Sequence, residues 1–409
     1  MNKSVVMLGT FDTKAVEFSA LRAKLTGHGL NVISIDCGIM PSKADFPVEY
    51  EAEAVALASG YTLEEMRNRG DRGEAIEHMR EGVTLVVKEL YDKGAISGII
   101  GMGGGGGTTL STSVMQHLPI GFPKLCISTL SSGNTIPYVG TRDIIMYPSI
   151  VDVCGINEIS EKVMTMAVAA FNGMVEAYPP APWKKTKRTI FLSMFGNTTP
   201  CGNECIRLLS ERGFDVTVFH TTGIGGRIME DMINDGYADA VLDLTLTEWA
   251  DQVCGGIEAA GEHRLEAAGK QGIPQLVIPG CVDMVNFGPP ETVPQRYQTG
   301  DRVFYSWDPF VTLMRTNISE NIAIAGAIAS RVNQSKGPVA CLLPMGGLSK
   351  MDVPGQTFYD PKADTVLFEE LIKKIDDKIR VEKSVFPIND KRFAAKAVEM
   401  LLALIDEAD

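Results

Sequence analysis

Five consecutive glycines, 103–107, are the residues of this chain whose type and spacing most directly indicate chemistry. They follow an apolar run, 95–100, that predicts a buried strand, and they precede Thr108 and Thr109 at the start of an expected helix. Glycines just beyond a strand let backbone N–H groups approach an anion, and a helix N-terminus adds its positive dipole end. A flexible turn needs fewer glycines. The run therefore predicts a phosphate-binding site.

The glycine run matches no standard nucleotide motif completely. Gly101, Gly103 and Gly106 have the spacing of a dinucleotide-binding loop, but no acidic residue follows about 20 positions later to hold a ribose. The Gly-x-x-x-x-Gly-Lys-Ser/Thr pattern of P-loop NTPases does not occur. An NAD site and a P-loop site are both disfavoured.

Polar residues also follow the strands expected at 3–8 and 122–128. Carboxyl ends of parallel strands share one edge of a sheet, which is where open α/β sheets bind ligands. The predicted nucleotide contacts are Thr10, Phe11, Asp12, Thr13, Lys14, Gly103, Gly104, Gly105, Gly106, Gly107, Thr108, Thr109, Ser132, Gly133 and Asn134. The alternatives are a helix cap at Asp12 or Thr13 and an ordinary polar loop at 129–138. Arg67, Arg69 and Arg72 lie in a long polar excursion that could reach a phosphate.

The second half carries a different set of polar residues at its expected strand ends. His220 and Glu248 form the candidate catalytic pair, since histidine titrates near neutral pH and can act as a general acid or base. The alternative is that His220 caps a buried loop and Glu248 caps the helix beginning near Trp249. The candidate substrate contacts are Thr221, Thr222, Asp283, Asn286 and Arg315, the last because its planar fork suits a carboxylate. No ligand spacing indicates a metal site built from protein side chains alone.

Length and composition limit the class of protein. A chain of 409 residues exceeds one ordinary domain, and no apolar run approaches the roughly 18 residues of a membrane span. A net charge of −13 opposes binding to nucleic acid. The eight cysteines contain no Cys-x-x-Cys pair, and the N-terminal apolar run is too short for a signal peptide. We expect a cytoplasmic protein with reduced thiols and no membrane partner.

Strands alternate with helices through both halves of the chain, which predicts parallel sheets covered on both faces. At an offset of 184, the elements 5–8, the helix ending at 27 and 30–35 align without a gap to 189–192, 202–212 and 214–219. The fold class predicted is two doubly wound, Rossmann-like α/β domains related by internal duplication and facing across a cleft. They occupy 1–180 and 188–409, separated by a proline-rich and basic linker at 178–187.

Several unusual motifs, taken in order, resemble the family of the tomato mosaic virus resistance protein, in which an N-terminal region binds ATP. They are Gly9-Thr10-Phe11-Asp12-Thr13-Lys14, the glycine run with Thr108-Thr109, Ser132-Gly133-Asn134-Thr135, Thr247-Glu248-Trp249-Ala250-Asp251, Asp283-Met284-Val285-Asn286-Phe287-Gly288 and Thr312-Leu313-Met314-Arg315-Thr316. The resemblance spans nearly the whole chain. It implies ATP binding by the first domain, through Thr10, Phe11, Asp12 and the glycine run, and it implies no agreed reaction.

Two classes of function follow from these patterns. The first is a cytoplasmic enzyme that holds ATP, with Mg²⁺ as a candidate companion ion, and acts on a small acidic or carbonyl metabolite in the cleft. The second is a nucleotide-responsive binding or regulatory protein without turnover. For either class we expect a homo-oligomer.

Overall fold

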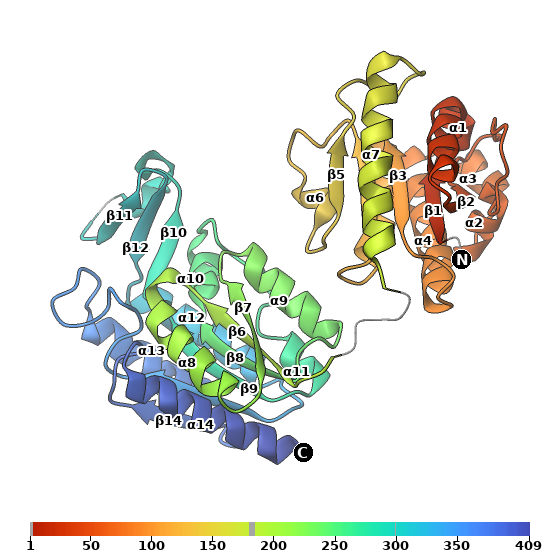
Figure 1. Ribbon diagram of the computed structural model, residues 1–409. Coiled ribbons are helices and arrows are strands. Elements are labelled where there is room, and N and C mark those ends of the chain that lie inside the picture. Colours follow the sequence, from red (N-terminus) through yellow and green to blue (C-terminus); the bar gives the residue numbers. More distant parts are fainter. Residues whose placement is uncertain (1–2, 180–184, 299) are drawn as a thin grey trace. The chain divides into compact units, whose positions relative to one another are not determined.

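A computed structural model describes residues 3–179, 185–298 and 300–409 (Figure 1). The chain divides into two compact units, residues 1–183 and 184–409. The predicted linker falls at this division, and its residues 180–184 lie outside the described residues. Within the described part of the chain, no helix is long and apolar enough to cross a membrane.

The first unit is built on a five-stranded parallel sheet with the order β2-β1-β3-β4-β5. Its strands are β1 (Ser4–Gly9), β2 (Asn31–Asp36), β3 (Ile99–Gly103), β4 (Lys124–Ser128) and β5 (Ile145–Pro148). Its helices are α1 (Phe11–Gly27), α2 (Ala52–Ala58), α3 (Leu63–Arg69), α4 (Arg72–Asp92), α5 (Gly105–Gln116), α6 (Ile136–Val139) and α7 (Glu158–Ala177). The order of the strands reverses between β1 and β3, because β2 lies on one side of β1 and the later strands lie on the other.

Alternating side chains of β1 explain why helices cover both faces of this sheet. Val5 and Met7 pack with residues of α1 and α7 in one core cluster, whereas Val6 and Leu8 pack with residues of α2, α4 and α5 in another. Successive side chains of a strand point to opposite faces, so an uninterrupted apolar strand needs cover on both sides. This is the predicted doubly wound arrangement, and Figure 1 shows α7 crossing one face.

The second unit is built on a six-stranded parallel sheet with the order β14-β13-β9-β8-β6-β7. Its strands are β6 (Thr189–Met194), β7 (Asp215–His220), β8 (Ala240–Thr245), β9 (Gln275–Gly280), β13 (Val339–Pro344) and β14 (Arg380–Ser384). Its α-helices are α8 (Thr199–Ser210), α9 (Ile224–Asn234), α10 (Thr247–Cys254), α11 (Ala267–Gln271), α12 (Ile318–Val332), α13 (Pro361–Lys374) and α14 (Lys391–Ala408). Short 3₁₀ helices lie at Gly196–Thr198, Pro290–Thr292 and Gln295–Tyr297.

The first four strands of each sheet are arranged in the same order, since β7-β6-β8-β9 corresponds to β2-β1-β3-β4. The pairing register differs, however. Val5 pairs with Val32, whereas Thr189 pairs with Asp215 and not with Val216. The gapless offset of 184 is therefore not kept between β6 and β7, although the shared strand order is what a duplication would produce.

Two features differ from the sequence-based expectations. The third strand begins at Ile99 and runs through Gly103, so the glycine run starts inside a strand and not after it. In addition, β10 (Met284–Phe287), β11 (Phe304–Asp308) and β12 (Val311–Arg315) form an antiparallel sheet with the order β10-β12-β11. Only two residues separate β11 from β12, and such a short connection requires an antiparallel pair. Figure 1 shows this small sheet extending from one end of the second unit.

Candidate functional site

A cavity of about 450 Å³ lies at the carboxyl edge of the first sheet, where β1 and β3 end. Open α/β sheets with this strand order bind ligands where the order reverses, between the first and third strands. The cavity brings together the predicted contacts Thr10, Asp12, Thr13, Lys14 and 103–107. It is also lined by Arg72, at the start of α4, and by residues that follow β2.

Two glycines of the run allow α5 to pack closely on β3. A Cβ atom on Gly103 would lie 2.9 Å from the Cα of Gly107, and one on Gly107 would lie 3.1 Å from the carbonyl oxygen of Met102. Both distances are shorter than ordinary carbon contacts. A side chain at position 103 would therefore force the backbone to shift, and one at position 107 would be tightly placed, so both positions favour glycine.

Packing does not require glycine at the other three positions of the run. A Cβ atom on Gly105 would meet nothing within 4 Å, and those on Gly104 and Gly106 would approach only side-chain atoms, at 3.8 and 3.9 Å. No residue of the run has a positive φ, so an unusual backbone conformation does not explain them either. Gly104, Gly105 and Gly106 instead leave the backbone bare where it borders the cavity.

The N-terminus of α5 lies at this bare stretch of backbone. The helix begins at Gly105, and no side chain caps it. The first N–H groups of a helix have no partner within the helix, and they lie at the positive end of its dipole. An anion next to Gly105 could therefore accept hydrogen bonds from the backbone without displacing a side chain.

Thr108 and Thr109 hold the helix in place and do not line the cavity. The Thr108 hydroxyl is buried and lies 2.6 Å from the Ser128 hydroxyl, which ties α5 to β4. The Thr109 hydroxyl donates to the carbonyl oxygen of Gly105 at 2.9 Å. Phe11 likewise has its side chain in the core, where its ring packs on Phe18, so only its backbone remains near the ligand edge.

Two cations and one carboxylate set the electrostatics of the cavity. Lys14 donates to the carbonyl oxygen of Val153, which leaves the ammonium group two further donors. The exposed Arg72 has no side-chain partner among the residues that the structure describes. Asp12 is 6% exposed; one oxygen accepts from the Met40 N–H at 3.1 Å, while the other is buried and has no partner among the described residues.

The three predicted contacts that follow β4, Ser132, Gly133 and Asn134, have different surroundings. Ser132 lines a second cavity of about 260 Å³ at the ends of β4 and β5. Asn134 accepts from the Ile136 N–H at 3.2 Å, at the start of α6, and the Gly133 N–H donates to Leu130 in a turn. Of these three predicted contacts, only Ser132 lines a cavity described here.

In the second unit, Glu248 belongs to a buried ion cluster. Arg264, which is 1% exposed, contacts Glu248, Glu230 and Asp243 at 2.8, 2.9 and 2.5 Å. Glu248 also accepts from the N–H groups of residues 223 and 226, at 2.9 and 3.0 Å. Burial raises the pKa of Glu248, and the guanidinium of Arg264 opposes that shift. The carboxylate is thus fully engaged by the protein.

His220 occupies a different environment from Glu248. It is exposed at the end of β7, and its ring centre lies 5.4 Å from that of Phe195. Within the described ranges, no hydrogen bond or ion pair joins His220 to Glu248. Their shared catalytic role therefore stays a prediction without a contact to support it.

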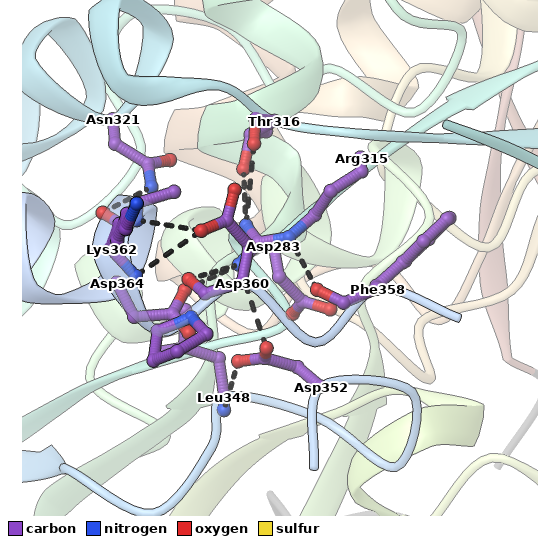
Figure 2. Close-up of polar contacts among 12 residues, drawn as sticks. Asp283, Arg315, Thr316, Asn321, Leu348, Asp352, Phe358, Asp360, Lys362 and Asp364 are labelled. Atoms are coloured by element: carbon purple, nitrogen blue, oxygen red, sulfur yellow. Dashed lines mark hydrogen bonds and ion pairs between the residues drawn. The ribbon is translucent and has the colours of Figure 1, made fainter. Parts of the chain in front are cut away.

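A second ion cluster surrounds Arg315 (Figure 2). Its guanidinium is 5% exposed and pairs with Asp364 and, at 3.5 Å, with Asp352, while its Nε donates to the carbonyl oxygen of Phe358 at 2.7 Å. Asp283 is fully buried and accepts from the Ser349 hydroxyl at 2.7 Å. Burial raises the pKa of Asp283 to about 6 and that of Asp352 to about 9.

The remaining candidate substrate contacts are also bonded within the protein. The Asn286 amide donates to Asp251 at 3.1 Å, and the buried Thr221 hydroxyl donates to the Met194 carbonyl oxygen at 3.2 Å. The Thr222 hydroxyl lies 3.4 Å from the carbonyl oxygen of His220. A substrate carboxylate would have to displace internal partners to reach these groups or Arg315.

Family comparisons match both units separately. The N-terminal domain of an uncharacterised protein family (UPF0261) matches residues 3–180, and the C-terminal domain of the same family matches residues 187–405. The chain belongs to the UPF0261 family.

Relatives of this UPF0261 chain occur in bacteria and plants. A UPF0261 protein of Clostridium tetani is 42% identical over 408 residues and covers all of both chains. The ToMV resistance protein Tm-1(GCR237) of Solanum lycopersicum is 41% identical over 339 residues, which are 81% of this chain and 45% of the tomato protein. The family resemblance predicted from the motifs is therefore confirmed.

Among solved structures, a UDP-N-acetylglucosamine 2-epimerase aligns with 100% of this chain and 98% of its own, at 9% identity and a TM-score of 0.23. The MurG protein of Acinetobacter baumannii aligns with 99% of both chains, at 11% identity and a TM-score of 0.22. Similarity this weak says nothing about the ligands of the UPF0261 chain.

The UPF0261 cavity includes residues that the sequence reasoning did not select. Cys37, Gly38 and Ile39 follow β2 and line it, and the same strand-end rule that selected the residues after β1 would have found them. Asp352 and Asp364, which hold Arg315, carry no sequence signal because they come from a loop and a helix far along the chain.

Proposed function

We propose that this UPF0261 chain binds ATP in the 450 Å³ cavity of its first unit. The supporting observation is the set of three glycines, Gly104, Gly105 and Gly106, that line the cavity and are required neither by packing nor by backbone conformation. Glycine loses more conformational freedom on folding than any other residue. Close approach of phosphate oxygens to the backbone N–H groups explains why glycine occurs there.

The rest of the cavity suits the other parts of a nucleotide. Its volume of about 450 Å³ is typical of small-molecule sites. Lys14 and Arg72 supply positive charge beside the glycines, whereas Ile76 and Met79 form an apolar wall against which a base can pack. The family resemblance implies ATP as the nucleotide.

Of the two classes of function, the contacts of the second unit favour a nucleotide-responsive binding protein. Glu248 is held by Arg264, and Arg315 is held by Asp352 and Asp364. An enzyme that used these groups would need them free for substrate. The enzyme class, a cytoplasmic protein acting on a small acidic or carbonyl metabolite through His220 and Glu248, is the alternative.

Calorimetric titration of the full chain with ATP, ADP, AMP and adenosine tests the proposal. We expect saturable ATP binding that weakens as phosphates are removed, and equal affinity for ATP and adenosine would contradict it. Phosphate release from ATP, measured with a panel of small carboxylic acids and carbonyl compounds, separates the two classes. Turnover that is lost in His220→Ala but kept in His263→Ala, an exposed histidine of the same unit, would establish the enzyme class instead.

A further inference from the structure

The hairpin of β11 and β12 presents a run of exposed apolar side chains at one end of the second unit (Figure 1). Every residue from 303 to 310 is exposed. The exposed aromatic side chains are Phe304 (36%), Tyr305 (40%), Trp307 (50%) and Phe310 (74%). Together they leave roughly 300–500 Å² of aromatic surface open to solvent. An apolar patch of this size on a single chain often marks an interaction site.

The exposure is confined to β11 and the turn that follows it, because the neighbouring strand β12 is buried. Leu313 of β12 packs in one core cluster and Met314 in another. Tyr305 pairs with Leu313 and Phe304 pairs with Met314, and paired residues lie on the same face of a sheet. The two rings therefore continue two apolar faces outward, past the point where the second unit covers them.

The backbone of β11 also has an open edge. Among the described strands, β11 pairs only with β12. The Val303 carbonyl oxygen accepts from the Arg315 N–H at 2.9 Å, and bonded pairs alternate along an antiparallel ladder. The N–H and C=O groups of Phe304 and Ser306 consequently point away from β12. An extended chain placed at this edge can pair with all four groups, as peptides do when they add a strand to a sheet.

The charge of the hairpin is negative. Asp308 is the one charged residue of the segment 303–310, and Asp301 is exposed just before that segment. The cation between them in sequence, Arg302, is engaged by Glu320 at 2.8 Å. The whole chain carries a net charge of −13. Positive side chains on a partner are therefore attracted to this surface, and acidic ones are repelled.

We propose that β11 is a docking strand for an extended, basic segment of another protein. The segment adds a strand beside Phe304 and Ser306, and its arginine or lysine side chains lie against the aromatic rings. Tyr305 and Trp307 suit this contact, because their ring centres are 6.4 Å apart and both side chains are about half-exposed. The negative face of an aromatic ring attracts a guanidinium or ammonium group. This surface belongs to the second unit, so the proposal does not rest on the ATP site.

A second copy of the chain fits this edge less well than a basic segment does. Each copy brings a net charge of −13, and a symmetric contact would place two copies of Asp301 and Asp308 at one interface. In addition, β11 has a bulge between Ser306 and Asp308, and bulges are a means by which natural edge strands avoid pairing with one another. A short partner segment needs only residues 304–306, which lie before the bulge.

Fluorescence anisotropy of labelled octapeptides, measured with the full chain and without nucleotide, tests the proposal. The probes are an alternating Arg-Val peptide, an alternating Glu-Val peptide, and the Arg-Val peptide with every backbone amide N-methylated. We expect saturable binding of Arg-Val and no binding of Glu-Val. The methylated peptide should bind at least about 10-fold more weakly, because it cannot donate hydrogen bonds to the edge of β11. Covering Trp307 should also shift its fluorescence emission to shorter wavelength.

Substitutions separate the aromatic contacts from general attraction between charges. Tyr305→Ser and Trp307→Ser should each weaken binding of the Arg-Val peptide by about 10- to 100-fold, as truncation of aromatic residues does at interfaces. Val385→Ser is the matched control, because it removes an apolar side chain that is 79% exposed and lies outside the hairpin. It should bind the peptide as the wild type does. Circular dichroism checks that all three variants are folded.

Sedimentation velocity of the wild type and Trp307→Ser identifies the occupant of the edge. We expect the same oligomeric state for both proteins. If the wild type self-associates and Trp307→Ser does not, a second copy occupies the edge and the proposal is wrong. It is also wrong if the Arg-Val peptide does not bind, or if folded Tyr305→Ser and Trp307→Ser bind it as tightly as the wild type. None of these results affects the ATP site, which the nucleotide titration tests separately.

Discussion

Replacing Gly105 with valine should weaken ATP binding by about 10- to 100-fold and leave the fold intact. Gly105 lines the cavity, and a Cβ atom there meets nothing within 4 Å, so the side chain costs no packing. Gly105 is the first residue of α5, and glycine is among the weakest helix formers, so valine there should leave stability unchanged or slightly raised. The valine branches occupy the space in which a phosphate oxygen would accept from the backbone N–H. Loss of one charge-assisted hydrogen bond costs about 1.5–3 kcal/mol, which is about 10- to 100-fold in the dissociation constant.

Gly103→Ala is the matched control for this prediction. Its Cβ atom would lie 2.9 Å from the backbone of Gly107, so this smaller change should lower the free energy of unfolding by about 1–3 kcal/mol, as overpacking does. Calorimetry with ATP measures affinity, and thermal unfolding followed by circular dichroism measures stability. The reasoning fails if Gly105→Val binds ATP as the wild type does, or if it destabilises the protein as much as Gly103→Ala.

Three further predictions concern charge. Lys14→Ala and Arg72→Ala should each weaken ATP by about 10- to 100-fold and adenosine hardly at all, because each removes a cation that can bond to phosphate; calorimetry with both ligands checks this. Arg315→Met should lower the free energy of unfolding by about 3–5 kcal/mol in urea titrations, since it leaves buried carboxylates uncompensated. Burial raises the pKa of Asp352 to about 9 and that of Asp283 to about 6 from an ordinary 3.8, so the folded state binds protons that the unfolded state releases. This stabilising contribution is complete below pH 3.8 and is lost as the pH rises to about 9. In wild type the urea concentration at the unfolding midpoint should therefore fall as the pH rises toward 9. In Asp352→Asn that fall should be smaller at the alkaline end of the range.

The elements of the first unit could largely be predicted from the sequence, because apolar strands alternate with amphipathic helices. The glycine run marked the correct edge of the sheet, since a strand followed by bare backbone and a helix start is a local pattern. The sequence could not show which glycines of the run are needed for packing and which are not. Whether a glycine is needed for packing, as at Gly103, or is free of contacts, as at Gly105, depends on how closely α5 approaches β3.

The second unit was harder to predict because its polar residues are organised by distant contacts. Arg264 and Arg315 each gather carboxylates from separate elements, and no local spacing identifies those partners. The strand-end rule placed Glu248 correctly, because α10 directly follows β8 of the parallel sheet, whereas Arg315 ends β12 of the antiparallel sheet. It could not show that internal ion pairs already engage both side chains.

The two units share a strand order but differ at the point where that order reverses. In the first unit β3 ends at Gly103, and the backbone beyond it borders a cavity. In the second unit β8 ends at Thr245, and the buried Thr245 hydroxyl lies 2.7 Å from the Thr198 hydroxyl. The buried hydroxyl of Thr247 donates to the Met284 carbonyl oxygen at 3.2 Å. The hydroxyls at the end of β8 and just after it are therefore already bonded within the protein. This difference at the strand end is why we propose ATP binding for the first unit alone.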